Sequence, residues 1–286
     1  MAQQAFDLNQ WCNDCGLTLA SDGHWRSRSL SSVSYPDNAH NAFSELEESS
    51  YWFNHRNTII TGIVTKHAPP GTIFDVGGGN GYVSLALRKA GFDSVVVEPG
   101  PHAVAVAKKR GLPVIEAAFQ DLDVPAGSIP AIGMFDVLEH IEDDTGALRG
   151  LYNALAPGGM LYLAVPAIQQ LWSGEDIAAG HYRRYHLKKL EAAVRKAGFE
   201  VKHGSYFFGV LTLPVAAFRA APWRIGLRSK PSQESAARAH KPPTGLAGSL
   251  VMSRLKRERE RAKTGAWPAM GSSCFVVARK PARPPE

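Results

Sequence analysis

The feature that most constrains the fold of this sequence is the glycine-rich segment 75–81, which reads Asp-Val-Gly-Gly-Gly-Asn-Gly. A short apolar run, residues 72–76, leads into it, and a helix-forming run, residues 82–90, follows it. Glycines at such a turn let the backbone approach a ligand closely, and the start of a helix offers unpaired N–H groups. The segment therefore predicts a ligand-binding turn at the carboxyl end of a parallel strand.

Residues 71–165 alternate β-rich runs with helix-forming runs, which is typical of an α/β fold with a parallel sheet between helices. After the first strand, further strands are expected at 94–98, 113–117, 131–137 and 160–166, and helices at 102–110 and 145–156. A loop at 167–180, a helix at 187–197 and strands at 199–207 and 274–279 complete the pattern.

On this interpretation the chain divides into three parts. Residues 1–66 form an N-terminal extension with a cap helix, and residues 67–207 together with 274–280 form the main domain. Residues 208–273 form a basic, Pro-interrupted insertion with a charged helix at 250–263 and a segment at 230–245 that is expected to be poorly ordered. An insertion of this length predicts a lid or a docking element.

Positive charge is concentrated in the C-terminal part of the chain. The formal net charge is +6, but from residue 219 onward fifteen Lys and Arg stand against four Glu. Such a stretch suits contact with anionic lipid or a phosphorylated substrate, although a run of charges is more often a solvated face. The longest apolar run, residues 207–218, is too short to span a bilayer. Residues 1–10 lack a secretory signal, so we expect a cytoplasmic protein, with peripheral contact at the inner membrane surface as an option.

The spacing of the glycines separates two kinds of nucleotide site. A fingerprint of the NAD type, Gly-x-Gly-x-x-Gly, fails because its third position, counted from Gly77, is Tyr82. A nicotinamide-dependent oxidoreductase is thereby disfavoured. Seventeen residues after Gly81, Glu98 ends the second strand, where a carboxylate can accept hydrogen bonds from both hydroxyls of a ribose.

These elements resemble the first motifs of class I S-adenosylmethionine-dependent methyltransferases, of the type 11/12-like group that includes the polyprenyl-phenol O-methyltransferases. The resemblance covers residues 51–206 and the last strand, through Phe-Gln-Asp-Leu at 119–122, Phe-Asp-Val-Leu-Glu-His at 135–140 and Pro-Gly-Gly at 157–159. It implies a Rossmann-like sheet of seven strands, mostly parallel with an antiparallel last strand, and S-adenosylmethionine as the cofactor. The cofactor-binding residues that it implies are Arg56, Asp75, Gly77, Gly78, Gly79, Asn80, Gly81, Glu98, Pro99, Phe119, Gln120, Phe135, Asp136 and Val137.

Within that set, the resemblance places Asp75 against the amino group of the cofactor and the glycines beneath its aminoacyl part. The family often carries an acidic residue near Ala118, so in this sequence the adenine contact is expected from Gln120 or from the backbone. Arg56 is expected to pair with the cofactor carboxylate.

Methyl transfer is an in-line displacement that needs alignment and, for some acceptors, a proton acceptor, but no covalent nucleophile. Glu139 and His140 follow Asp136 at i+3 and i+4 and can converge on one face. We predict them as catalytic residues together with His181, with a divalent-metal site and a structural histidine as open alternatives. The predicted acceptor-binding residues are Trp52, Trp172, Tyr182, Arg183, Arg184 and Tyr185.

Cys12-x-x-Cys15, with His24 or His40, is a second candidate for a metal site. A tetrahedral zinc site needs four ligands, and this spacing matches no standard zinc ribbon. No metal is therefore assigned as a cofactor, and a divalent ion stays an alternative that the sequence does not favour.

The predicted activity is methyl transfer from S-adenosylmethionine to O, N or C of a small-molecule or lipid-linked acceptor. Residues 135–138 lack the Asn/Asp-Pro-Pro-Tyr pattern of amide and nucleobase N-methylation, and residues 254–263 lack interleaved aromatics, so a nucleic-acid partner is not expected. The alternative is a non-catalytic protein that binds the cofactor or acts as a scaffold on the same fold.

Overall fold

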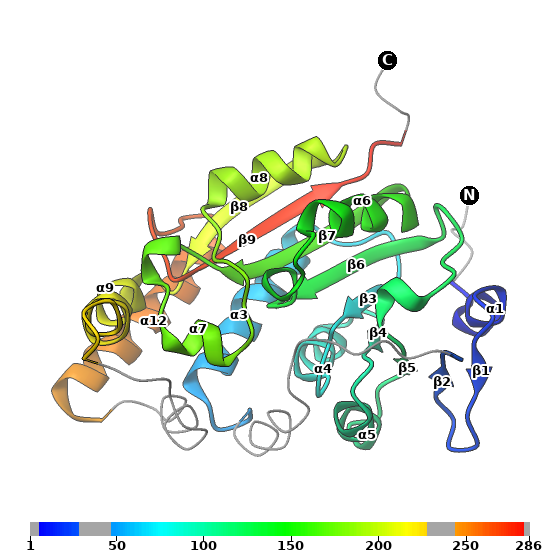
Figure 1. The fold of residues 1–286 in the computed structure, drawn as a ribbon, viewed down its shortest axis with the longest axis horizontal. Helices are drawn as coiled ribbons and strands as arrows, with labels where there is room; N and C mark the ends of the chain where they lie inside the picture. The colour runs from blue at the N-terminus through cyan, green and yellow to red at the C-terminus, as the bar shows by residue number, and fades with distance from the viewer. Residues whose placement is uncertain (1–5, 29–46, 228–243, 283–286) are drawn as a thin grey trace.

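A computed structural model describes residues 6–28, 47–227 and 244–282 of the chain. These residues build one sheet of nine strands, in the order β1-β2-β5-β4-β3-β6-β7-β9-β8, with helices on both of its faces (Figure 1). The strands are β1 (Thr18–Leu19), β2 (Trp25–Arg26), β3 (Ile73–Val76), β4 (Ser94–Val97), β5 (Val114–Glu116), β6 (Ile129–Phe135), β7 (Leu155–Pro166), β8 (Glu200–Phe207) and β9 (Ser273–Arg279).

Five consecutive strands of the sheet, β5-β4-β3-β6-β7, run parallel to one another, and β9 runs antiparallel between β7 and β8. This arrangement confirms the predicted α/β, Rossmann-like fold with an antiparallel last strand. The sequence missed β1 and β2, and β2 pairs in parallel with β5. Strands of two residues are too short to display an alternating pattern, so the N-terminal segment lengthens the sheet without a visible signal.

Most of the helices alternate with the strands. They are α1 (Leu8–Asp14), α3 (Tyr51–Lys66), α4 (Tyr82–Lys89), α5 (Pro101–Lys109), α6 (Asp144–Ala154), α7 (Gly174–Ala178), α8 (Leu187–Lys196), α9 (Thr212–Val215), α10 (Ala221–Arg224) and α12 (Gly245–Lys263). Short single-turn elements are η1 (Phe119–Asp121), η2 (Leu138–His140), η3 (Gln169–Leu171), η4 (Gly209–Leu211) and η5 (Ala216–Ala220).

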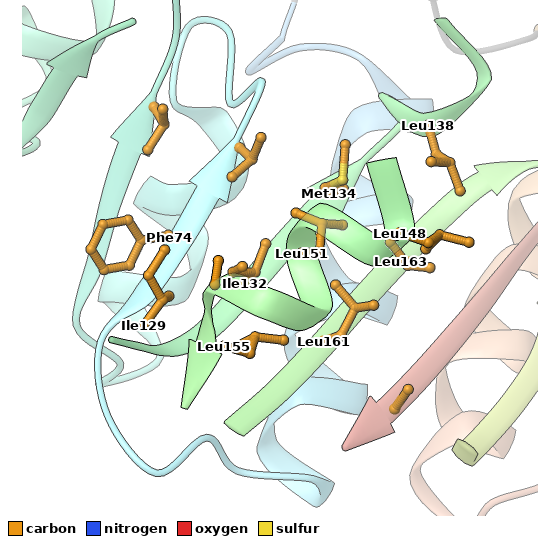
Figure 2. Close-up of a cluster of buried hydrophobic side chains, with 14 of the residues drawn as sticks. Phe74, Ile129, Ile132, Met134, Leu138, Leu148, Leu151, Leu155, Leu161 and Leu163 are labelled. Atoms are coloured by element: carbon orange, nitrogen blue, oxygen red, sulfur yellow. The ribbon is translucent and has the colours of Figure 1, made fainter. Parts of the chain in front are cut away.

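Two apolar clusters hold the helices to the two faces of the sheet. One cluster joins α1, α6 and α8 to the sheet and includes Leu148, Leu151 and Leu190. Figure 2 shows how Leu148 and Leu151 of α6 meet β-strand side chains such as Leu161. The other cluster joins α3, α4 and α12 to the opposite face. Neighbouring residues of one strand, such as Ile73 and Phe74, enter different clusters because side chains alternate across a sheet.

The insertion between β8 and β9 contains η4, α9, η5, α10 and α12. Its anchor is Glu258, whose carboxylate accepts hydrogen bonds from the ring Nε2 of His55 at 2.9 Å and from the backbone N–H groups of Phe208 at 2.7 Å and Gly209 at 2.8 Å. The predicted helix at 250–263 is confirmed and begins earlier, at Gly245. Residues 230–243, most of the segment expected to be poorly ordered, lie outside the described residues. Within the described part of the chain, none of the helices combines the length and the apolarity that crossing a bilayer requires.

Candidate active site

The glycine loop follows β3 directly and turns the chain into α4. Gly77, Gly79 and Gly81 all have positive φ angles. A Cβ atom on Gly77 would lie 2.7 Å from Cγ2 of Val137, and one on Gly81 would lie 2.3 Å from Cδ1 of Leu112. Both positions therefore require glycine for conformation and for space. The loop lies at the carboxyl edge of the parallel strands, as the sequence predicts.

Two acidic side chains are fixed around this loop. Oε2 of Glu98 accepts a hydrogen bond from the backbone N–H of Gly79 at 2.9 Å, and Oε1 accepts one from that of Gly100 at 2.8 Å. Asp75 is buried and accepts a hydrogen bond from Oγ of Ser84 at 2.8 Å. Burial raises the pKa of Asp75 to about 6, against the opposing effects of Ser84 and Arg56. The protein itself therefore orients both carboxyl groups.

Other residues predicted to bind the cofactor line the same edge of the sheet. Pro99 follows Glu98 after β4, and Phe119 and Gln120 lie in η1, after β5. Gln120 is exposed, whereas Phe119 packs partly against the core. Phe135 ends β6 and is buried. Buried Asn80 approaches Glu47, a residue that the sequence did not single out, with 3.3 Å from its Nδ2 to Oε1 of Glu47.

Arg56 connects helix α3 to the end of β6. Its Nη1 donates a hydrogen bond to Oδ2 of Asp136 at 2.6 Å, and its guanidinium lies 5.1 Å from the ring centres of Trp52 and Phe53. Asp136 has φ of 60°, which is uncommon for a residue other than glycine. The ion pair therefore ties Asp136, directly after β6, to helix α3.

A compact group of titratable side chains follows Asp136. One ligating atom from each of Glu139, His140 and His181 lies within 4.8 Å of the others. Oε1 of Glu139 lies 4.0 Å from Nε2 of His181, and the two imidazole rings meet edge to face with 4.7 Å between their centres. The structure thus brings together the three residues that the sequence predicts to be catalytic, from segments about 40 positions apart.

The charge state of this group follows from its burial. Glu139 has no exposed surface, and among the described residues neither of its carboxyl oxygens has a hydrogen-bond partner. Burial, and then the charge of Asp136, raises the pKa of Glu139 well above its ordinary value. Burial, and then the charge of His181, lowers the pKa of His140 to about 4. Burial thus favours the uncharged forms of both Glu139 and His140.

Sequence reasoning missed Asp176, which orients His181. Its Oδ1 lies 3.0 Å from Nδ1 of His181 and 2.7 Å from Nε of Arg184, and its Oδ2 accepts a hydrogen bond from the backbone N–H of Ser173 at 2.9 Å. Burial opposes ionisation, but the hydrogen bonds and charges of His181 and Arg184 keep the pKa of Asp176 below its ordinary value. Asp176 therefore fixes the orientation of the His181 ring, with Nδ1 against Asp176 and Nε2 on the side of Glu139.

The residues predicted to bind the acceptor divide into two groups. Arg183 pairs with Asp144 at 2.9 Å, and the hydroxyl of buried Tyr185 donates a hydrogen bond to that carboxylate, also at 2.9 Å. Arg184 pairs with Asp176 in turn. These contacts hold residues 183–185 against the rest of the protein. Trp172 is partly exposed, Tyr182 is 48% exposed, and Trp52 stacks on Phe208 with 5.3 Å between the ring centres.

The metal alternatives of the sequence can be compared with this geometry. Glu139, His140 and His181 are the one His/Cys/Asp/Glu group with metal-ligand spacing that the described ranges contain. Two imidazoles, together with the carboxyl group of Glu139, whose oxygens have no hydrogen-bond partner in the described structure, fit a divalent transition ion. Cys12 and Cys15 are buried instead in the apolar core, where burial raises the pKa of each thiol to about 12, and His24 lies against Glu116 and Asp22. His40 lies outside the described residues.

Comparisons with known proteins place this geometry among methyltransferases. A family model described as a methyltransferase domain matches residues 52–203. An uncharacterised methyltransferase of Mycobacterium sp. (strain JLS) is 29% identical over 152 residues, which cover 51% of this chain and 60% of that protein. A ubiquinone biosynthesis O-methyltransferase of Xanthomonas oryzae pv. oryzae (strain PXO99A) is 30% identical over 99 residues, which cover 32% of this chain and 41% of that protein.

Among solved structures, the [4+2]-cyclase SpnF shares the fold with a TM-score of 0.56 at 18% identity, over 86% of this chain and 94% of the cyclase. The chain spans 60% and 41% of the length of these two curated relatives, less than two thirds of each. It shares its fold with a protein that is named for another reaction.

Proposed function

Because the chain belongs to the methyltransferase domain family through residues 52–203, we propose that it transfers a methyl group from S-adenosylmethionine to a hydroxyl oxygen of an aromatic acceptor, either a small molecule or a lipid-linked one. The observation that carries the proposal is the group Glu139, His140 and His181 beside Asp136, at the same sheet edge as the glycine loop. A hydroxyl is the acceptor that most needs such a group, because its proton has to leave.

The cofactor side of the proposal rests on Glu98, Asp75 and the glycine loop. When bound, S-adenosylmethionine supplies a sulfonium-linked methyl group, whose carbon–sulfur bond breaks as the carbon–oxygen bond forms, leaving S-adenosylhomocysteine and a methyl ether. Two backbone N–H groups orient Glu98 at the end of β4, where its carboxylate is the acceptor for the ribose hydroxyls in this proposal. Asp75 faces the amino group, and the Arg56–Asp136 pair closes the side toward the acceptor.

On the acceptor side, His181 is the residue that takes the proton from the hydroxyl. Asp176 fixes its Nδ1–H, so that Nε2 is the basic atom. The pKa of His140 is lowered to about 4, so its ring carries no positive charge at neutral pH and does not act on the acceptor as a charge. Trp172 and Tyr182 supply partly exposed aromatic surface on the loop that carries His181.

In the alternative in which a divalent cation is held by Glu139, His140 and His181, the cation would lower the pKa of the acceptor hydroxyl, and His181 would be a ligand rather than the proton acceptor. The name of the Xanthomonas relative, a ubiquinone biosynthesis O-methyltransferase, supports a phenolic hydroxyl as the acceptor. The partial length of the match leaves the acceptor of this chain a proposal.

The test is methyl transfer by the purified full chain from S-adenosylmethionine labelled in the methyl group. Catechol carrying a farnesyl chain is compared with aniline carrying the same chain, with and without a chelator and added Mn²⁺ or Zn²⁺. We expect labelled methyl ether from the catechol and little product from the aniline. Product from the aniline alone would contradict the hydroxyl assignment. Binding of S-adenosylhomocysteine without product from either compound would favour the non-catalytic alternative, which shares the fold.

A further inference from the structure

Exposed apolar side chains are concentrated in the insertion between β8 and β9. Among the described residues, ten large apolar side chains are exposed, and seven of them belong to this segment. Single exposed apolar residues are ordinary on a protein surface, but a concentration on one element marks a site of interaction. We define the insertion face by five of them, with their exposed fractions: Leu213 (79%), Ile225 (70%), Leu227 (78%), Leu246 (93%) and Leu250 (56%).

The helices that carry the insertion face are tied to one another and to the rest of the molecule. Both α9 and α12 contact η4, and Val215 of α9 and Val251 of α12 pack against the same apolar cluster. Figure 1 shows α9 and α12 at one end of the molecule, away from β1 and β2. Glu258 fastens α12 through His55 and the backbone at Phe208 and Gly209.

Positive charge accompanies these apolar side chains. The described residues 208–227 and 244–272 contain eight Lys and Arg and two Glu. One of the two, Glu258, is buried, and the other, Glu260, binds Lys263 at 2.9 Å. Arg254, Arg257 and Arg261 are exposed along α12. Among the described residues, the face therefore combines aliphatic side chains with an excess of positive charge.

This combination points to one class of partner. Aliphatic side chains enter the boundary between lipid headgroups and acyl chains, and Lys or Arg beside them attract anionic headgroups. Nucleic acid would use several aromatic side chains for base stacking, whereas among the seven exposed large apolar side chains of the described insertion Phe218 alone is aromatic. A second copy of the chain would bring two positive faces together across a twofold interface. We propose that the insertion face docks the protein on the surface of a bilayer that contains anionic lipid.

The insertion also contacts the acceptor side of the site. Arg219 of η5 lies 3.7 Å from Glu175, and Nη2 of Arg224 donates a hydrogen bond to the carbonyl of Gln170 at 2.7 Å. The segment 170–175 lies just before Asp176 and His181 and includes Trp172. A docked insertion would therefore hold the acceptor loop near the bilayer, where a lipid-linked acceptor resides. This consequence rests on the proposed function, whereas docking itself does not.

Co-sedimentation of the full chain with vesicles tests the docking. Vesicles of phosphatidylcholine alone are compared with vesicles of phosphatidylcholine mixed with phosphatidylglycerol, at low and at high salt. We expect binding to the mixed vesicles that weakens as salt screens the charges. Equal binding to both kinds of vesicle, or binding to neither, would overturn the proposal.

Matched variants separate the insertion face from general surface effects. Leu213→Glu together with Leu246→Glu should reduce vesicle binding by at least about tenfold, since each leucine loses its burial in lipid. The control is Leu19→Glu, which changes a 60% exposed leucine on β1 and should leave binding unchanged. Arg254→Glu with Arg257→Glu should reduce binding to anionic vesicles, whereas Lys188→Glu with Lys189→Glu on α8 alters the net charge equally and should have little effect.

Two further readouts distinguish the possible failures. Size-exclusion chromatography reveals self-association, and a dimer that the Leu213→Glu and Leu246→Glu changes dissociate, without vesicle binding by the unchanged chain, would replace lipid with a second copy as the partner. Calorimetric binding of S-adenosylhomocysteine should be the same for every variant. Loss of vesicle binding with intact ligand binding therefore concerns the insertion face alone, and absence of ligand binding in the unchanged chain concerns the proposed function alone.

Discussion

The cofactor side and the acceptor side of the site differ in the hydrogen bonding of particular buried carboxyl groups. On the cofactor side, Glu98 accepts two backbone hydrogen bonds and Asp75 accepts one from Ser84. On the acceptor side, Asp176 is also well paired, but Glu139 is completely buried, and within the described structure its carboxyl oxygens have no hydrogen-bond partner. Glu98 and Asp75 are thus oriented before any ligand arrives, whereas Glu139 retains a deficit of hydrogen bonds.

Such a deficit lowers stability, because a buried polar group without a partner loses its hydration without compensation. Natural chains tolerate such groups mainly where a ligand, an ion or a proton-transfer step uses them. The two sides of the site therefore have different roles. One side holds a cofactor of fixed shape, and the other carries the groups that respond to charge.

The largest expected effect concerns the acceptor side alone. His181→Ala should lower kcat by about 1,000-fold, the scale of a lost general base, while the affinity for S-adenosylhomocysteine changes little. Steady-state kinetics and calorimetry measure the two quantities. The matched control is His186→Ala, five positions away at the N-cap of α8. A parallel loss of cofactor affinity in His181→Ala would mean that the two sides are not separable.

The converse change should act on the cofactor side. Glu98→Ala should weaken binding of S-adenosylmethionine by about 100-fold, because two hydrogen bonds to a charged acceptor are lost. Asp93→Ala, an exposed carboxylate that precedes the same strand, serves as the control. An affinity for Glu98→Ala within threefold of the unchanged chain would remove Glu98 from the cofactor site.

A smaller effect should appear at the positioning residue. Asp176→Asn removes the charge that fixes His181 and should lower kcat by about 30-fold with little change in KM, in line with other residues that orient a functional histidine. Unchanged kcat in a folded Asp176→Asn protein would show that the contact is purely structural.

The smallest expected effect concerns stability. The folded pKa of Glu139 is raised, so the folded protein keeps a proton that the unfolded chain releases above pH 4.5, and stability falls as pH rises from there toward the folded pKa. In that window the unchanged chain should lose about 1.4 kcal/mol per pH unit relative to Glu139→Gln. Denaturant unfolding in the presence of a chelator measures the difference. Parallel stability curves for the two proteins would mean that Glu139 is ionised, and therefore paired, in the folded state.

The same contrast explains what the sequence could predict. The glycine loop, Glu98 and the strand–helix alternation are contiguous patterns, so the fold and the cofactor side follow from local spacing. Asp176 sits in a five-residue helix without a motif, and its contact with His181 depends on how the loop after β7 folds over η2. The strands β1 and β2 were missed for a similar reason, since two residues of strand carry no periodicity. The position of Asp176 and the two strands β1 and β2 all depend on contacts between segments that are separate in the sequence.

A calorimetric titration of the purified chain with S-adenosylhomocysteine tests the assignment of the cofactor site. It is run beside the His181→Ala variant, with NAD as the competing ligand. We predict micromolar affinity for S-adenosylhomocysteine in both proteins and no heat of binding with NAD. A folded chain that does not bind S-adenosylhomocysteine, or that binds NAD in its place, would contradict the central claim that this sheet edge is a methyltransferase site.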